Sequence, residues 1–162
     1  MPEHFIARRP EDLPTREQLA QMTGFEFIQA IHQGRLPGAP IAETLNFRMH
    51  HVEPGRVVFR GTPKFEFLNP QGTVHGGWYG TLLDSAMGCA VATMLPRGRA
   101  YTTLEYKINL TRALPVGMEI DCEARVSHVG RSTGVAEGTI RGVVDGRLYA
   151  TGSTTCIVMA AG

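Results

Sequence analysis

The second half of the chain alternates between hydrophobic and polar residues, which is the pattern of strands that bury one face. Four runs alternate in this way, over residues 104–110, 118–126, 135–144 and 148–159. The Asp145-Gly146 pair between the last two runs predicts a two-residue hairpin turn in which both residues adopt positive φ. Short connections make neighbouring strands antiparallel, so this half predicts an antiparallel sheet.

The N-terminal part of the chain predicts helical structure. Thr15, with Gln18 three residues later, is a capping-box signature for a helix start, and a helical pattern continues to Gly34. Residues 1–14 hold three prolines and little periodicity, which predicts a loosely held arm. Residues 36–40 hold two prolines and a glycine, which predicts a connection without regular structure.

A hairpin and a long apolar helix separate this part from the four strands. Alternation over 45–60, with a turn signal at Pro54-Gly55, predicts the hairpin. The run from Gly80 to Leu95 is apolar nearly all round at helical spacing, which predicts a buried helix. The order fits an α+β fold in which one curved antiparallel sheet of about six strands wraps around one long central helix. We expect an N-terminal arm and helix over 1–40 and the main domain over 41–162.

Composition and charge argue against several classes of function. The 162 residues carry 16 Lys and Arg against 15 Asp and Glu, a net charge of +1, which argues against a nucleic-acid-binding protein. The longest apolar run, Ala86 to Leu95, falls short of the ~20 residues that a membrane-spanning helix needs. Met1 to Pro10 lacks the apolar core of a signal peptide. We therefore expect a cytoplasmic protein with no nucleic-acid or membrane partner.

The cysteines and histidines do not form a recognisable ligand pattern. Cys89, Cys122 and Cys156 lie far apart in the chain, and the six histidines show no paired metal-ligand spacing. We expect the cysteines to be small core residues and the protein to need neither a metal nor another cofactor.

Asp84 is the acidic residue that the pattern leaves without an ordinary explanation. It is the only acidic side chain between Glu66 and Glu105, and it lies in the helix predicted to be buried. An isolated carboxylate in an apolar medium is costly, so it is either a hydrogen-bonded structural acid or a functional one. Glycines at the start of this helix leave backbone N–H groups accessible to a developing oxyanion. In a symmetric dimer, the carboxylate and these N–H groups could come from different subunits.

The spacing of these residues resembles a known family. His75-Gly76-Gly77 is followed by Asp84 and preceded, six residues earlier, by Asn69. This motif is similar to that of the hotdog-fold acyl-CoA thioesterases of the PaaI-like (phenylacetic acid degradation) branch, and the similarity extends from about Thr44 to Met159. The resemblance implies a hotdog fold, an acyl-CoA substrate, no cofactor, and a homodimer that pairs again into a tetramer.

The resemblance also implies roles for individual residues. Asp84 matches the carboxylate that acts as general base on water or as nucleophile on the thioester carbonyl. Gly77 matches the residue whose backbone N–H polarises that carbonyl. Asn69 and His75 match residues that orient the thioester, the attacking water and the turn. A hydroxyl that positions water falls at Thr103 or at its neighbour Thr102.

Other residues are candidates for binding the substrate. Gly76 and Trp78 flank Gly77; Trp78 could line the acyl pocket or pack at a subunit interface. The phosphates of coenzyme A need cations, and by charge type alone we expect contacts from Arg131 and from Arg97 or Arg99.

We therefore expect an acyl-CoA thioesterase that releases an acid and free coenzyme A. The acyl group could be aromatic or a short or medium chain. A non-catalytic acyl-CoA-binding hotdog protein is the alternative from another class. A hotdog dehydratase or hydratase is disfavoured because no His-Phe-Pro-Gly stretch occurs.

Overall fold

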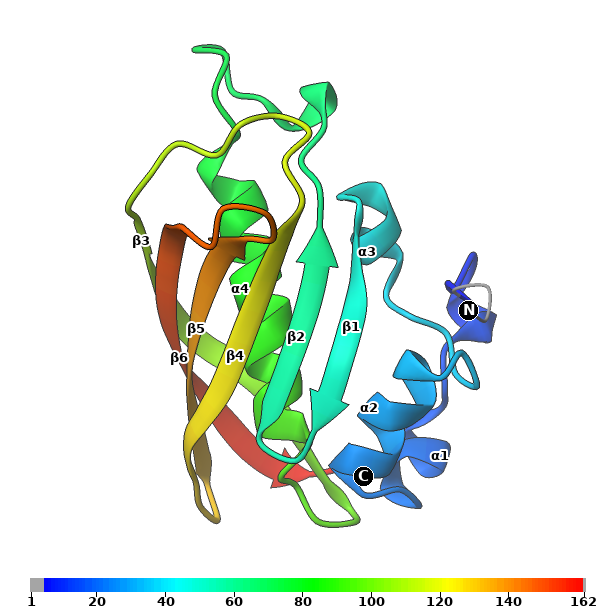
Figure 1. Ribbon diagram of the computed structural model, residues 1–162. Coiled ribbons are helices and arrows are strands. Elements are labelled where there is room, and N and C mark those ends of the chain that lie inside the picture. Colours follow the sequence, from blue (N-terminus) through cyan, green and yellow to red (C-terminus); the bar gives the residue numbers. More distant parts are fainter. Residues whose placement is uncertain (1–4, 162) are drawn as a thin grey trace.

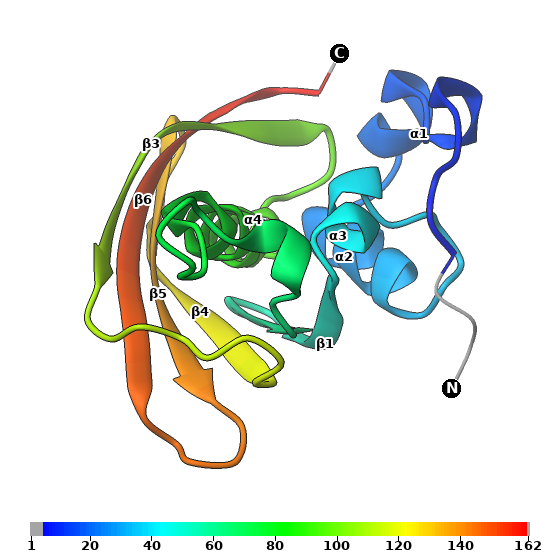
Figure 2. The ribbon, with the colours of Figure 1, turned by 90° about the horizontal axis from the view of Figure 1, so that it is seen from above.

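A single six-stranded antiparallel sheet curves around the long helix α4, Gly76–Ala92 (Figures 1 and 2). The computed structural model describes residues 5–161. The strands lie in the order β1-β2-β4-β5-β6-β3, and every neighbouring pair is antiparallel. This confirms the predicted fold, a sheet wrapped around one central helix. The strand bounds are β1 Phe47–Glu53, β2 Arg56–Gly61, β3 Arg99–Leu110, β4 Ile120–Val129, β5 Thr133–Gly142 and β6 Leu148–Ala160.

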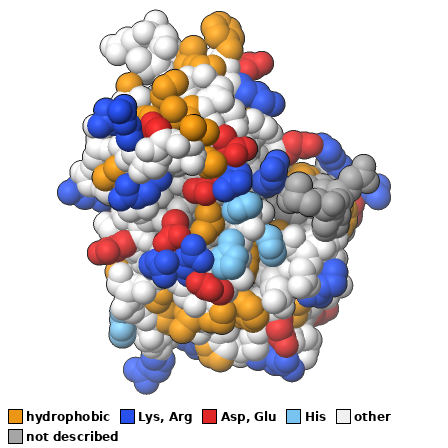
Figure 3. All heavy atoms as spheres, in the orientation of Figure 1, with side chains coloured by type: hydrophobic (Ala, Val, Ile, Leu, Met, Phe, Trp, Pro, Cys, Tyr) orange, Lys and Arg blue, Asp and Glu red, His pale blue; other side chains and the backbone are white. Residues whose placement is uncertain are grey.

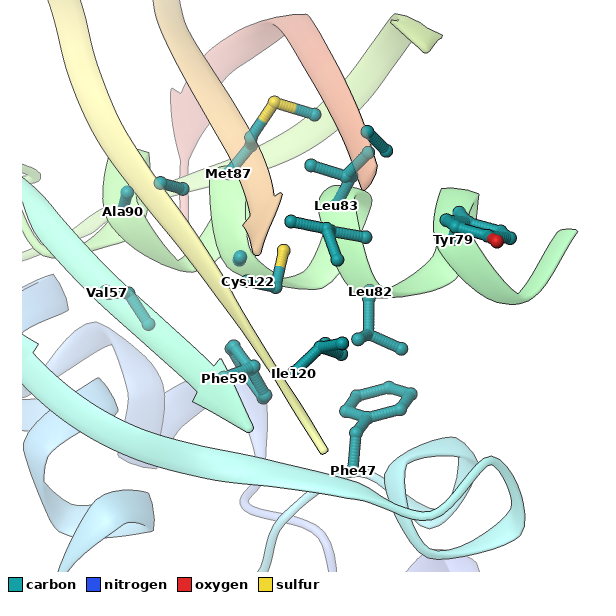
Figure 4. Packing of buried hydrophobic residues seen from close by; sticks show 14 of the residues in the cluster. Phe47, Val57, Phe59, Tyr79, Leu82, Leu83, Met87, Ala90, Ile120 and Cys122 are labelled. Carbon is teal, nitrogen blue, oxygen red and sulfur yellow. The ribbon is translucent and has the colours of Figure 1, made fainter. Parts of the chain in front are cut away.

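The core lies between the concave face of the sheet and α4. Leu82, Leu83 and Met87 of the helix have no exposed surface. Figure 4 shows these side chains among residues of the facing strands, including Phe59 of β2 and Ile120 of β4. Helix α4 begins four residues before the predicted start, because its glycines continue the helix back to the cap at His75.

The N-terminal helices are shorter and more numerous than predicted. The capping box at Thr15 is present and starts α1, Arg16–Ala20. A second capping box, formed by Thr23 and Glu26, restarts the chain as α2, Gly24–His32, so the single predicted helical stretch is wrong. A proline at the first helical position begins a further helix that was not predicted, α3, Pro40–Thr44. Two 3-10 turns complete the elements, η1 Pro10–Asp12 and η2 Phe65–Phe67.

The first described residues of the predicted arm, 5–7, are packed rather than loosely held. The Gly38 N–H donates to the carbonyl of Phe5 (2.8 Å), and Ile6 forms a parallel bridge with Gly38. Ala7 is buried. This prediction was wrong because a lack of periodicity excludes regular elements, but does not exclude backbone pairing with a distant segment.

Helix α2 lies beside α4 (Figure 2). The N–H of Gly24 donates to the carbonyl of Leu95 (3.0 Å), and a Cβ on Gly24 would lie 1.7 Å from the carbonyl oxygen of Ala92. No side chain fits there, so the glycine allows the two helices to meet backbone to backbone. The N-terminal segment is thereby fixed to the central helix.

Strand β3 forms one edge of the sheet and contains a register shift between Thr103 and Glu105. Before the shift, Tyr101 and Thr103 face α4; after it, Tyr106, Ile108 and Leu110 do. Leu104 at the shift is 60% exposed, and two further apolar residues of this edge strand are also exposed, Tyr106 and Leu110.

The turn at Asp145-Gly146 differs from the predicted type. Gly146 has a φ of +65°, whereas Asn46 is the only non-glycine residue with positive φ in the described chain. The Gly142 N–H donates to the Arg147 carbonyl (3.1 Å), so a longer loop joins β5 and β6. The Asp145 carboxylate stabilises this loop instead, by accepting from the Arg147 N–H (3.0 Å).

The outer face of the sheet is polar and charged. Ion pairs join β2 to β4, Arg56 with Glu123 and Arg60 with Asp121, each at 2.7 Å. Figure 3 shows acidic and basic side chains interleaved on this face. Across residues 5–161, no helix combines the length and the apolar content required to span a membrane.

Candidate active site

Asp84 lines a cavity of about 480 Å³ beside the central helix. Helix α4 contributes Asp84 and Cys89 to the lining, and β3 contributes Tyr101 and Thr103. The opposite wall comes from β1 and from the N-terminal segment, with apolar side chains that include Phe5, Ile6, Ile31 and Ile41. Polar and charged side chains also line the cavity, among them Arg48 and Glu119. The predicted lone carboxylate therefore faces a mixed polar and apolar space in which an acyl group could lie.

The Asp84 carboxylate is held by one hydrogen bond. The Thr103 hydroxyl donates to Oδ1 of Asp84 (2.9 Å), and residues 5–161 provide no other hydrogen bond or ion pair to this carboxylate. Of the two threonines considered in the sequence, Thr103 faces the helix and Thr102 is exposed on the opposite side of the strand. The register of β3 thus distinguishes neighbours that residue spacing could not.

Two groups that line the cavity with Asp84, the Cys89 thiol and the Tyr101 hydroxyl, are uncharged. Burial raises the pKa of the Cys89 thiol to about 12, and the Asp84 charge adds to this shift. Burial also raises the pKa of Tyr101 well above its ordinary value, with further contributions from Cys89, Cys156 and Asp84. Both groups stay protonated near neutral pH, so they act only as neutral donors or weak acceptors.

The start of α4 carries the His-Gly-Gly motif at the exposed end of the helix. His75 is the N-cap, and its Nδ1 accepts a hydrogen bond from the Gly77 N–H (2.8 Å). The sequence predicted this N–H as an available donor; instead it is satisfied locally, because the first N–H groups of a helix need an acceptor from outside the helix ladder. To polarise a carbonyl, it must exchange His75 Nδ1 for the carbonyl oxygen.

Asn69 organises the loop that precedes the helix. Its Oδ1 accepts from the N–H groups of Gln71 (2.9 Å) and Thr73 (3.2 Å), and its Nδ2 donates to Oγ1 of Thr73 (2.8 Å). Within the described chain, these contacts are confined to the loop. Asn69 therefore orients the turn, one of the roles expected of it, and makes no contact with Asp84.

Asp84 and the helix start are separated within one chain. Gly77 and Asp84 are seven residues apart on α4, which corresponds to about 10 Å along the helix axis. A thioester carbonyl attacked beside Asp84 is therefore out of reach of the same chain's Gly77.

Trp78 does not line the cavity, contrary to the prediction. It is 2% exposed, its Nε1 donates to the carbonyl of Leu45 (2.9 Å), and its ring packs edge-on against Tyr79. Its position on α4 turns it into the core between the helix and the segment before β1. Gly76, which was also predicted to bind the substrate, lies next to Leu110 of β3.

The three arginines lie near the start of β3 and the turn between β4 and β5. Arg97 forms an ion pair with Glu26 of α2 (3.5 Å), and the Arg99 guanidinium donates to the carbonyl of Arg131 (2.6 Å). None of the three lines the Asp84 cavity. Within residues 5–161, no three His, Cys, Asp or Glu side chains are placed to share a metal ion.

Sequence reasoning missed two contributors to the cavity. Tyr101 lies two residues before Thr103 and on the same side of the strand, so strand periodicity could have indicated it. No sequence pattern indicated that the N-terminal segment forms a wall of the cavity, because the contact between residues 5–41 and the helix depends on long-range packing.

The family assignment follows from a match that covers more than half of the chain. A model of the thioesterase superfamily matches residues 71–156, which contain the helix start, Asp84 and Thr103. The chain belongs to this superfamily. The predicted hotdog fold and the predicted membership in a thioesterase family are confirmed.

Among solved structures, the chain is similar to members of the PaaI-like branch and to a protein bound to acetyl-CoA. A proposed thioesterase related to phenylacetic acid degradation, from Ralstonia eutropha, is 28% identical with a TM-score of 0.74, over 81% of this chain and 98% of that chain. A Streptococcus mutans protein bound to acetyl-CoA is 28% identical with a TM-score of 0.65, over 71% of this chain and 90% of that chain. The predicted likeness to the PaaI-like branch is confirmed.

Curated relatives match over shorter stretches. A proposed esterase of Halobacterium salinarum is 37% identical over 67 residues, which are 41% of this chain and 44% of that protein. The chain spans about half the length of the curated relatives it matches, 44% and 61%.

Proposed function

We propose that the protein is an acyl-CoA thioesterase that hydrolyses an aromatic or a short- or medium-chain acyl-CoA to a free acid and coenzyme A. The observation that carries the proposal is the Asp84 carboxylate, which one threonine hydroxyl holds at the wall of a cavity beside the central helix. The membership in the thioesterase superfamily supports it, as does the similarity to a structure bound to acetyl-CoA.

The chemistry needs a base and a stabilised oxyanion. In the proposed reaction, the carboxylate of Asp84 takes a proton from a water molecule while the water oxygen attacks the thioester carbonyl. The carbon–sulfur bond then breaks, and the thiolate takes up the proton to give a free thiol and a carboxylic acid. The leaving thiol has a pKa close to that of cysteine, about 8.5, so a strong acid is not needed to expel it. Asp84 could instead attack the carbonyl itself, expel the thiolate and form a mixed anhydride; attack of water on the aspartyl carbonyl of this anhydride in a single turnover in ¹⁸O-water would then label the Asp84 carboxylate.

We propose that the complete site forms across a homodimer. Strand β3 is an edge with exposed apolar side chains, Leu104 and Tyr106 among them, and its backbone is open to pairing with a second copy. A twofold pairing of β3 with β3 would set two α4 helices antiparallel. Asp84 would then face the partner subunit's Gly77, which removes the separation of about 10 Å within one chain. We further propose that dimers pair into a tetramer.

A thiol-trapping assay over a panel of acyl-CoAs tests the function. We expect saturable release of free coenzyme A from at least one aromatic or short- or medium-chain member. Saturable binding without release would support the alternative, a non-catalytic acyl-CoA-binding protein. If the panel showed neither release of coenzyme A nor saturable binding, both the thioesterase proposal and the binding-protein alternative would be contradicted.

A further inference from the structure

Tyr101 brings a hydroxyl group to the wall of the Asp84 cavity. The side chain lines the cavity from β3, on the same side of the strand as Thr103. Its hydroxyl oxygen lies over Gly88 of α4, where a Cβ would be only 2.9 Å away. Any residue other than glycine at position 88 would displace the ring. The helix therefore leaves room for this hydroxyl at a defined position.

The position of the hydroxyl relative to Asp84 follows from the helix. Gly88 and Asp84 are four residues apart and lie one above the other on one helix face, with Cβ positions roughly 6 Å apart. Tyr101 thus presents its hydroxyl about one helical turn beyond the carboxylate. For Tyr101 to contact the acyl group, a thioester beside Asp84 must place its acyl chain, rather than coenzyme A, in this part of the cavity.

The hydroxyl is a neutral donor without a partner. Burial keeps the phenol protonated by raising the pKa of Tyr101 well above its ordinary value. In the described chain, no protein group makes a hydrogen bond with this hydroxyl. A polar group in a cavity gains free energy when a ligand satisfies it, and a ligand that lacks the matching atom leaves it unpaired.

We propose that Tyr101 determines specificity: its hydroxyl donates a hydrogen bond to an oxygen on the acyl group, and so favours hydroxy- or oxoacyl-CoAs over unsubstituted chains. This inference rests on the proposed function. It adds to that function the chemical class of the preferred acyl group.

Binding to a variant without turnover tests the inference. In the Asp84→Asn background, isothermal titration gives dissociation constants for butanoyl-CoA and for each enantiomer of 3-hydroxybutanoyl-CoA. We expect one enantiomer to bind about tenfold more tightly than butanoyl-CoA. Adding Tyr101→Phe, which keeps the ring, should reduce that ratio to near one.

Tyr106→Phe is the matched control. Tyr106 lies on the same strand, and its hydroxyl also packs over a glycine of α4, Gly80, but it does not line the cavity. This variant should keep the tenfold ratio. A ratio unaffected by Tyr101→Phe, or no preference in the parent, would overturn the inference while the thioesterase proposal stands. Failure of all three ligands to bind would overturn both.

Discussion

The polar groups at the start of helix α4 have hydrogen-bond partners from nearby residues, whereas those in its middle have one partner or none within the described chain. At the start, the Gly77 N–H and the ring of His75 satisfy each other, and Asn69 satisfies the loop before them. In the middle, Asp84 has a single partner, Thr103, and the hydroxyl of Tyr101 has none within the described chain. The start is exposed and built from neighbours in sequence, whereas the middle faces a cavity and depends on a strand that follows later. Local contacts therefore stabilise the start of the helix, whereas the unsatisfied groups in the cavity are available to a substrate.

Asp84→Asn should show the largest effect. Asparagine keeps the shape of the side chain and an oxygen for Thr103, but it cannot accept a proton. Loss of a general base lowers kcat by about 10²–10⁴-fold, and we expect a loss in that range in the thiol-release assay. Glu137→Gln, which changes an exposed carboxylate of β5 that does not line the cavity, is the control and should keep activity within about twofold. Near-parental hydrolysis by Asp84→Asn would show that Asp84, in the middle of the helix, is not the general base.

Gly77→Pro tests the start of the helix and its assignment to the other subunit. Proline removes the N–H at a first-turn position where the helix ladder does not use it, and we expect a loss of about 10²–10³-fold in kcat. Equal amounts of this variant and Asp84→Asn, reassorted into dimers, should recover about a quarter of parental activity, because half of the dimers then hold one intact site.

Each variant alone serves as the baseline for the mixing experiment, and thermal unfolding verifies that both are folded. No recovery after demonstrated exchange of subunits would place the two groups in one chain, in conflict with their separation along α4.

Thr103→Val should have a smaller effect. Valine keeps the volume but removes the hydrogen bond to Oδ1 of Asp84, so the carboxylate loses its orientation. A hydrogen bond to a charged group corresponds to about a tenfold change, which we expect in kcat rather than in KM. Thr102→Val is the matched control on the exposed side of β3, and should change kcat by less than about twofold. Equal losses in the two variants would contradict the register assigned to Thr103.

Arg131→Ala should have the smallest effect. Arg131 is exposed and lies outside the cavity, and its backbone carbonyl accepts a hydrogen bond from Arg99, so we expect its side chain to contact the phosphates of coenzyme A rather than the acyl group. An exposed ion pair contributes up to about 1 kcal/mol, so KM should rise by a few-fold at low salt and lose part of its salt dependence. Arg141→Ala on β5 should leave KM unchanged. If KM also stays unchanged in Arg131→Ala, this arginine has no role in binding.

The sequence was sufficient for the regular parts of the fold. Period-two alternation identified the strands of the second half, and the apolar helical run identified α4, because both patterns follow from repeating backbone geometry. The capping box at Thr15 was confirmed for the same reason, since its partner is three residues away. Where the backbone departed from regularity, the predictions were wrong, as at the Asp145-Gly146 loop and the break before Gly24.

The candidate site likewise has features that the sequence could predict and features that depend on how distant segments pack. Residue patterns alone identified Asp84 as an unusual carboxylate on a buried helix, and they identified the glycine-rich segment that starts this helix. Tertiary structure decided which side chains share the cavity: it selected Thr103 over Thr102, placed Tyr101 opposite Gly88, turned Trp78 into the core and closed one wall with residues from the N-terminal segment. The two kinds of feature differ in how far apart in the sequence the interacting residues lie. Caps and periodicity arise from interactions over a few residues, whereas a cavity depends on the register and packing of segments far apart in the chain.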